Sequence, residues 1–330
     1  MIEKRLRNVV ISGYGYKIKC RKNLVLIKGE NENIIISPRE IEQLVITGAV
    51  SLTSDVVRVL MDNNVDIVFV GHRPKFFARI VRSDYNFITD LWRKQIMLPT
   101  ERRLEIAKEI VDCLIYNKLR MLQHLEKNRD IDFSVEIDRL KYEREKSSTY
   151  EDIPSLMGVE GDATRIYFSA VRKIIPKEFG FKKRVKHPPL DPINSMLSYG
   201  YTILLSRVSY GLLLSGLNVY EGILHESYRN REALAYDLME EFRQPIVDRV
   251  VITFIVRGMV KTDDFDIRKE MCYMKENFKR NYLDSLYSRF ENMYRYLGKP
   301  MEFLDIIFEQ AKKLSNAIKN DEKYVGFRYR

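Results

Sequence analysis

The stretch LPTERRLEIAKEIVDCLIYNKLRMLQHL, from Leu98 to Leu125, decides the fold class of this chain. Its apolar residues recur at i, i+3 and i+4, the spacing that turns one face of an α-helix toward a core. Pro99 and Thr100 lie where a helix start favours a cap, and Glu101 adds the negative charge favoured in the first turn. The stretch therefore predicts a long amphipathic helix.

Further helical patterns follow this helix. The same spacing returns over residues 162–175, 191–215, 231–259, 266–296 and 300–319. We therefore predict that residues 86–330 form a larger, all-α C-terminal domain. The last residues, 320–330, are polar and basic, and we expect them to be held loosely, as chain termini often are.

The residues before the long helix have a different pattern, in which short β-branched runs alternate with turn signals, as is typical of strands. One helical run, TSDVVRVLMDNN, spans Thr53 to Asn64. We predict a two-domain α+β chain, with a small β-rich N-terminal domain over residues 1–85, a meander of strands with one crossover helix, and a boundary near residues 82–92. The strand runs include NVVISGYGYKIKC (Asn8 to Cys20), NLVLIKG (Asn23 to Gly29), NIIISP (Asn33 to Pro38) and VDIVFVG (Val65 to Gly71).

One helix start is especially clear. In PPLDPINSMLSYGYTILL, Pro188 and Pro189 block a preceding helix, and Asp191 suits the N-cap. Pro192 suits the first helical position, where its missing N–H costs nothing. Small residues then recur through the segment, which predicts a buried central helix with close neighbours.

Composition limits the classes of protein. The formal net charge is +10, from 56 Lys and Arg against 46 Asp and Glu, so nucleic acid is a candidate partner. The three cysteines lie far apart, without the spacing of a zinc site, which favours a reducing compartment. No signal peptide precedes the first strand, and no apolar run reaches the ~20 residues that span a bilayer. We expect a cytoplasmic protein that does not cross a membrane.

A histidine and a group of acids are the candidates for chemistry. His225 precedes a helix predicted from residue 231, on which Asp237, Glu240 and Glu241 occupy positions i, i+3 and i+4. We expect these carboxylates on one face of the helix. Three acids so close repel one another unless a cation lies between them, which favours a divalent metal. The alternative is a solvated acidic face paired with nearby arginines.

A further acid lies upstream. Glu160 falls between Gly158 and Gly161, just ahead of a helix that we expect Asp162 to cap, and the glycines would let a phosphate approach the backbone. One imidazole with two or three carboxylates suits Mn²⁺ or Mg²⁺. Such a site can polarise a phosphoryl oxygen and activate the attacking oxygen.

A basic loop, FKKRVKHPP, spans Phe181 to Pro189. Its cations could contact a DNA backbone, although an ordinary solvated loop explains the same charges equally well. The candidate DNA-binding residues are Lys182, Lys183, Arg184 and Lys186.

Three ordered motifs carry a family resemblance. They are GVEG around Glu160, then PPLDPINSMLSYGYTILL, and then SGLNVYEGILHESYRNREALAYDLMEEFRQPIVDRVV, which contains His225 and Glu240. Together they resemble the CRISPR-associated adaptation endonucleases, the integrase subunits of spacer acquisition, over nearly the whole chain. The resemblance implies that Glu160, His225 and Glu240 are catalytic and bind Mn²⁺ or Mg²⁺. It also implies that Asp237 assists the metal or supports its ligands, and we expect Glu241 and Arg243 to form a structural ion pair.

The resemblance further implies an assembly and a reaction. A homodimer paired through the β-rich domain would present the helical, metal-binding domain, and two dimers would flank a small ferredoxin-like CRISPR adaptation partner protein. The substrate would be double-stranded DNA with branched ends. A 3′-hydroxyl of captured foreign DNA would attack a phosphodiester at the edge of a CRISPR repeat by transesterification. With water as the nucleophile, the same site would act as a DNA endonuclease.

Two other functions stay open. A helical metal phosphohydrolase is one, although the HD type needs an adjacent His-Asp pair and none of the four histidines is followed by Asp. The other is a non-catalytic, basic DNA-binding scaffold. A scaffold predicts DNA binding that survives the replacement of Glu160 or His225.

Overall fold

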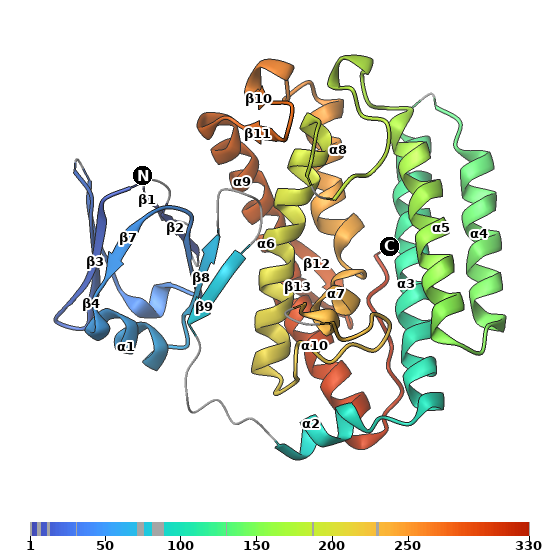
Figure 1. The fold of residues 1–330 in the computed structure, drawn as a ribbon, viewed down its shortest axis with the longest axis horizontal. Coiled ribbons are helices and arrows are strands. Elements are labelled where there is room, and N and C mark those ends of the chain that lie inside the picture. The colour runs from blue at the N-terminus through green and yellow to red at the C-terminus, as the bar shows by residue number, and fades with distance from the viewer. Residues whose placement is uncertain are drawn as a thin grey trace. The chain divides into compact units, whose positions relative to one another are not determined.

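The structure is a computed structural model. It describes residues 2–4, 8–11, 14–30, 32–70, 76–80, 89–129, 131–186, 188–228 and 231–329. The chain divides into two compact units, Met1–Asn86 and Phe87–Arg330, which are drawn in Figure 1. It is α+β, with strands in the N-terminal unit and mostly helices in the C-terminal unit. Most of the boundary expected near residues 82–92 lies outside the described residues.

Two β-sheets and the helix α1 (Ser54–Asp62) form the N-terminal unit. The simple meander expected from the sequence is wrong, because β2, β6 and β8 run parallel in one sheet and β3 pairs in parallel with β7 in the other. The predicted run from Asn8 to Cys20 is accordingly divided between the sheets. The five-stranded sheet has the order β1 (Ile2–Lys4), β2 (Asn8–Ile11), β6 (Gln43–Ile46), β8 (Asp66–Val70), β9 (Phe76–Ile80). The four-stranded sheet has the order β5 (Asn33–Ile36), β4 (Leu24–Lys28), β3 (Tyr16–Arg21), β7 (Val50–Leu52).

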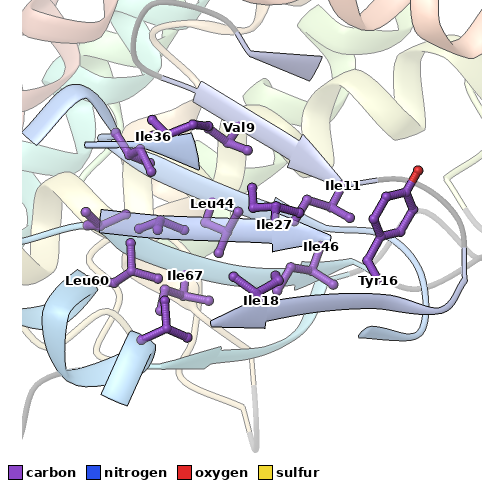
Figure 2. Packing of buried hydrophobic residues seen from close by; sticks show 14 residues of the cluster. Val9, Ile11, Tyr16, Ile18, Ile27, Ile36, Leu44, Ile46, Leu60 and Ile67 are labelled. Carbon is purple, nitrogen blue, oxygen red and sulfur yellow. The ribbon is translucent and has the colours of Figure 1, made fainter. Parts of the chain in front are cut away.

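A shared apolar core holds the two sheets together. Buried and exposed side chains alternate from the start of β3, as the period of two in a strand requires. Ile18 and Ile27 of the four-stranded sheet belong to the same cluster as Leu44 and Ile67 of the five-stranded sheet, as Figure 2 shows. Leu60 of α1 packs into the same cluster. The unit is therefore a pair of sheets that bury one common face.

Helices make up most of the C-terminal unit, but the prediction that it is all α is wrong. Two hairpins accompany the helices, β10 (Phe265–Ile267) with β11 (Cys272–Met274) and β12 (Met293–Tyr296) with β13 (Lys299–Glu302). Positive φ angles at Leu297 and Gly298 form the tight turn of the second hairpin. The longer helices are α2 (Thr89–Ile96), α3 (Thr100–Lys127), α4 (Ser134–Thr149), α5 (Ile153–Arg172), α6 (Pro192–Leu214), α7 (Ala233–Met239), α8 (Arg249–Val256), α9 (Glu276–Glu291) and α10 (Phe303–Asn320). Short helical turns are η1 (Pro38–Glu40) in the N-terminal unit and η2 (Lys177–Phe179) and η4 (Thr262–Asp264) here, where the π-helix η3 (Arg243–Asp248) also lies.

The helix α6 is the buried central helix that the sequence predicts. The Asp191 carboxylate accepts a hydrogen bond from the backbone N–H of Asn194 (2.9 Å), so it is the N-cap. A side chain at Gly200 would clash with the Tyr282 hydroxyl and with Val247 of η3, so the glycine permits close packing. Even so, no helix in the described part of the chain is long and apolar enough to cross a membrane.

Aromatic side chains of the C-terminal tail are buried, which corrects the expectation that the tail is held loosely. Tyr324 is 3% exposed and Phe327 is 0% exposed. The ring of Phe327 stacks on Phe242, with ring centroids 5.3 Å apart. The aromatic residues of the tail therefore hold it in place despite its charged residues, because they pack beside the segment that follows α7.

Candidate active site

Glu160 lies in the middle of α5. This helix begins earlier than predicted because Asp152, not Asp162, is its N-cap, and its carboxylate accepts a hydrogen bond from the backbone N–H of Ser155 (2.8 Å). Glu160 is half-buried, and its Oε1 accepts a hydrogen bond from Thr164 Oγ1 one turn later (3.0 Å). Glu160 is therefore presented from a regular helix and not from a glycine loop.

His225 and Asp237 form a hydrogen-bonded pair. Nδ1 of His225 lies 2.6 Å from Oδ1 of Asp237, and the His225 side chain is 11% exposed. The backbone N–H groups of Ile223, Leu224 and His225 also donate to the Asp237 carboxylate, at 2.6, 3.0 and 3.0 Å. Four hydrogen bonds fill the acceptor positions of one carboxylate, so Asp237 holds the loop and orients the imidazole. Among the described residues nothing hydrogen-bonds Nε2 of His225, so this nitrogen can bind a ligand.

The surroundings of His225 favour its protonated form. Burial by itself lowers the pKa of His225, but the hydrogen bond to Asp237, the charge of Asp237 and the charge of Glu240 outweigh it. The pKa is therefore raised above its usual value. A negative field at this imidazole is also what attracts a cation to it.

Glu240 lies directly after α7, where the helix predicted over residues 231–259 is broken. Residues 240–242 form a turn, and η3 follows before α8. Pro245 lacks the N–H that a continuous α-helix needs, which accounts for the wider turns of η3. Glu240 is 3% exposed, and its Oε1 accepts a hydrogen bond from the Arg243 guanidinium (2.8 Å).

Glu160 and Glu240 share neighbouring cations. Burial raises the pKa of Glu240, but the charges of Arg243 and Lys118 outweigh it and lower the pKa below its usual value. Lys118 is 1% exposed, and the charges of both Glu240 and Glu160 act on it. The same two carboxylates act on Arg243 and on Lys186. Glu160 and Glu240 therefore lie within electrostatic reach of the same three cations.

Glu241 faces the C-terminal tail. The Tyr324 hydroxyl and the backbone N–H of Phe327 (2.7 Å) donate to its carboxylate. The predicted ion pair between Glu241 and Arg243 is wrong, because Arg243 pairs with Glu240. The expectation of three carboxylates on one face of a helix is also wrong. The turn after α7 directs Glu241 toward the C-terminal tail.

Sequence reasoning missed Lys118 and the partner of Arg243. Lys118 lies within the apolar stripe of α3 beside Asn117, and this polar pair inside DCLIYNKLRML is the signal that could have found it. Asn117 Nδ2 donates to the carbonyl oxygens of Glu241 (2.8 Å) and Phe327 (3.0 Å). Two successive residues of α3 therefore serve the site, one through its charge and one by holding the backbone.

One cation of the predicted DNA-binding loop is directed inward. Arg184 donates to Asn194 Oδ1 (2.9 Å) and Ser198 Oγ (3.0 Å), both on α6. These bonds attach the loop to α6. The phosphate contacts stay a prediction for all four cations of the loop, of which Lys182, Lys183 and Lys186 are exposed.

The donor atoms fit a divalent cation. Among the described residues, no three His, Cys, Asp or Glu side chains lie close enough together to form a finished metal site. The available donors are Nε2 of His225, the Glu160 carboxylate and Oε2 of Glu240, which accepts no hydrogen bond from the described residues. One imidazole with carboxylate oxygens is a set that Mn²⁺ accepts. A histidine whose other nitrogen donates to a carboxylate is also the usual support of a metal ligand.

Comparison of folds defines the class of protein. A casposase bound to an integration product matches this chain with a TM-score of 0.85 at 23% identity, over 98% of this chain and 94% of that chain. A Cas1 protein from Thermotoga maritima matches with a TM-score of 0.83 at 22% identity, over 98% of this chain and 100% of that chain. The strand-rich unit and the helical unit with its histidine and glutamates therefore have the fold of a Cas1 protein.

Sequence comparison identifies the family. Residues 9–288 match the family model described as CRISPR associated protein Cas1. CRISPR-associated endonuclease Cas1 1 from Methanospirillum hungatei is 33% identical, over 98% of this chain and 100% of that protein. A relative with the same name from Archaeoglobus fulgidus is 28% identical, over 97% of this chain and 98% of that protein. The chain belongs to the Cas1 family, which confirms the resemblance carried by the three ordered motifs.

Proposed function

We propose that this chain is a metal-dependent DNA endonuclease and integrase of CRISPR adaptation, which joins the 3′-hydroxyl ends of captured foreign DNA to the CRISPR repeat array by transesterification. Its relatives are named endonucleases, and a protein of the same fold was solved with an integration product. The observation that carries the proposal is that the charge of Glu240 acts on His225, while Glu240 and Glu160 both act on the same three cations. A protein that acts on CRISPR DNA works in the cytoplasm.

In this proposal Glu160, His225 and Glu240 are the catalytic residues and hold Mn²⁺ or Mg²⁺. When bound, the metal polarises the phosphodiester and stabilises the negative charge of the transition state. Asp237 keeps the ring proton of His225 on Nδ1, so Nε2 is free to bind. Asp237 acts in this way as a positioning residue and not as a ligand.

The cations around the carboxylates orient Glu240 and offset the negative charge of the site. Arg243 holds Glu240 in one orientation, because it bonds one oxygen and leaves the other. Lys118 and Lys186 supply positive charge beside the acids. Without it, two glutamates would repel a phosphodiester anion that approaches them. These residues therefore let an acidic site accept DNA.

The backbone of α5 is open at the two glycines that lie near Glu160 in the chain. A Cβ atom added at Gly158 or Gly161 would meet no described atom within 4 Å. A phosphate can come closer to this bare backbone than to a covered one. The predicted role of the glycines is kept here, although they lie inside a helix.

The partners proposed are the other part of this function. We expect a homodimer paired through residues 1–85, a small ferredoxin-like adaptation partner, and double-stranded DNA with branched ends. A solved Cas6-RT-Cas1–Cas2 complex contains a chain that matches with a TM-score of 0.83 at 25% identity, over 100% of this chain and 37% of that chain. That assembly supports the proposed partnership.

The test is Mn²⁺-dependent cleavage and strand joining on branched and double-stranded DNA. Wild type would be compared with His225→Ala, Glu160→Ala and the control Glu145→Ala, an exposed acid on α4. We expect products from wild type and Glu145→Ala only, while all four proteins stay folded and bind DNA. Equal activity in all four would refute this site. DNA binding by wild type without any cleavage or joining would favour the non-catalytic scaffold.

A further inference from the structure

A cavity lies between the C-terminal half of α3 and α8. Its volume is about 200 Å³. This is less than the ~300 Å³ at which pockets for small-molecule ligands begin. It is several times the ~30 Å³ that one water molecule occupies. The cavity therefore suits one small polar group and not a whole nucleotide cofactor.

The polar lining of this cavity is rich in arginine and contains no acid among the described residues. Three guanidinium groups line it, and none of the three forms a salt bridge with the described residues. Guanidinium groups bind phosphate oxygens in paired hydrogen bonds. A carboxylate in the lining would repel a phosphate. The polar residues are His124, Asn128, Arg129, Arg249, Thr253 and Arg257.

The charges around the cavity are positive. Burial lowers the pKa of Arg249, and the charges of Arg289 and Arg257 lower it further, with Tyr329 acting in the opposite direction. Burial lowers the pKa of His124, and the charge of Arg249 lowers it further. Positive charges held close together repel one another, and an anion placed between them removes this electrostatic repulsion. The cavity is therefore prepared for an anionic group.

The cavity lies on the same elements as the candidate active site. Leu125 lines it and follows Lys118 by seven residues, which is two turns along one face of α3 and about 10 Å at 1.5 Å per residue. The other wall, α8, continues from Glu240 through η3. In Figure 1, α3 and the α7–α8 segment run toward the same end of the unit. The cavity and the catalytic carboxylates therefore share the same two structural elements, so one bound strand can contact both.

We propose that this cavity binds one phosphate of the DNA strand, at a site separate from the catalytic carboxylates, and so fixes where the strand lies relative to the reacting bond. The proposal rests on DNA as the substrate, as proposed above. Arg249 and Arg257 hold the phosphate oxygens together, and Asn128 lies at the exposed rim. The site is a positioning site and takes no part in bond breaking.

The first experiment measures DNA binding by the full chain across salt concentrations, by fluorescence anisotropy with a branched duplex. Loss of one phosphate contact reduces the slope of log K against log salt by about 0.7–0.9. Because one phosphate is shared, the double variant Arg249→Gln/Arg257→Gln should lose about one such step, and each single variant should lose less. Two independent contacts would lose about twice as much in the double variant, which would overturn the proposal. Arg139→Gln/Arg172→Gln, exposed on α4 and α5, is the matched control and should keep the wild-type slope.

A second variant guards against misfolding. Asn128 is exposed, and its amide donates to the His124 carbonyl (2.6 Å). Asn128→Asp and Asn128→Ala both lose this bond, so the two variants differ in the negative charge at the rim of the cavity. We expect Asn128→Asp to lose affinity for DNA, with Asn128→Ala as its neutral control. Equal affinity in Asn128→Asp and Asn128→Ala would overturn the proposal.

The position of the phosphate is tested with strands that carry a single neutral methylphosphonate. In wild type, one position close to the cleaved bond should cost about tenfold or more in affinity, as expected for charged hydrogen bonds. In Arg249→Gln/Arg257→Gln the same substitution should cost nothing. A penalty that persists in the double variant overturns this site and leaves the proposed function intact. Failure of the wild type to bind DNA at all overturns both.

Discussion

Replacing Asp237 with asparagine tests whether this carboxylate acts through the proton on His225. In the wild type, Oδ1 accepts from the backbone N–H and Nδ1 of His225, and Oδ2 accepts from the N–H groups of Ile223 and Leu224. An amide NH₂ at the Oδ2 position would face two backbone donors and lose two hydrogen bonds. At the Oδ1 position it would lose only one, because it can donate to Nδ1 once the ring proton moves to Nε2. We therefore expect the second orientation, which blocks the nitrogen proposed to bind the metal.

The magnitude divides between folding and metal binding. One buried N–H left without an acceptor lowers the free energy of unfolding by about 1–3 kcal/mol. Returning the ring proton to Nδ1 before the metal binds costs about as much again. That second cost corresponds to Mn²⁺ affinity weakened by about 10- to 100-fold, the range known for lost supports of metal-binding histidines.

Two measurements separate these effects. Urea unfolding of the metal-free Asp237→Asn protein reports the folding cost, and calorimetric titration with Mn²⁺ reports the affinity. His225→Ala combined with Asp237→Asn is the control, because without the imidazole there is no ring proton to misplace. The asparagine should therefore weaken Mn²⁺ binding only when His225 is present. Equal weakening in both backgrounds would refute the argument and leave Asp237 as a support of the loop alone.

Three further outcomes are expected. Phe327→Ala removes a fully buried ring and should lower the free energy of unfolding in urea by about 3–5 kcal/mol, whereas Val325→Ala, at an exposed position in the same tail, should change it little. Lys118→Met removes a cation that lies near both Glu160 and Glu240, so Mn²⁺ should bind about two- to tenfold more tightly in calorimetry; unchanged affinity would contradict the shared charge. Burial raises the pKa of Asp112, but hydrogen bonds from Arg144 and Arg328 outweigh it and lower the pKa below 3.8. A lowered folded pKa stabilises the fold above the unfolded value and loses this effect as the pH falls through the folded value, so urea titrations should show wild type and Asp112→Asn converging in acid. A difference that stays constant with pH would exclude this linkage.

The sequence predicts best those elements whose stabilising signals are local. The helix expected over residues 98–125 is α3, and Asp191 caps α6 as expected, because periodic apolar faces and caps lie within a few residues of each other. The order of strands first and helices afterwards is also predicted, because the spacing of apolar residues changes from that of strands to that of helices along the chain. Local signals of equal strength compete, however. Asp152 caps α5 although Asp162 has the same side chain, because the buried residues Leu156 and Val159 extend the packed face of the helix across two glycines.

The strand pattern shows a second limit. The run from Asn8 to Cys20 has one composition, but β2 pairs with β6 and β3 pairs with β4 and β7. Pairing depends on strands that lie tens of residues away, so alternation identifies a strand without identifying its sheet. The hairpin β12–β13 pairs locally, but its strands overlap residues 266–296 and 300–319, whose spacing also suits a helix.

The site depends on contacts between residues far apart in the sequence, which residue spacing cannot predict. Glu240 and Glu241 are adjacent and chemically alike, but Glu240 lies near Lys118 and Glu241 holds the tail. Pro245 was a local sign of the break after α7, because proline does not fit inside an α-helix. The break alone does not decide which acid faces which way. Phe327 does so in part, since its backbone N–H binds the Glu241 carboxylate from 86 residues away while its carbonyl oxygen accepts from Asn117. Residues that touch neither metal nor DNA in the proposed mechanism therefore determine which carboxylate is catalytic.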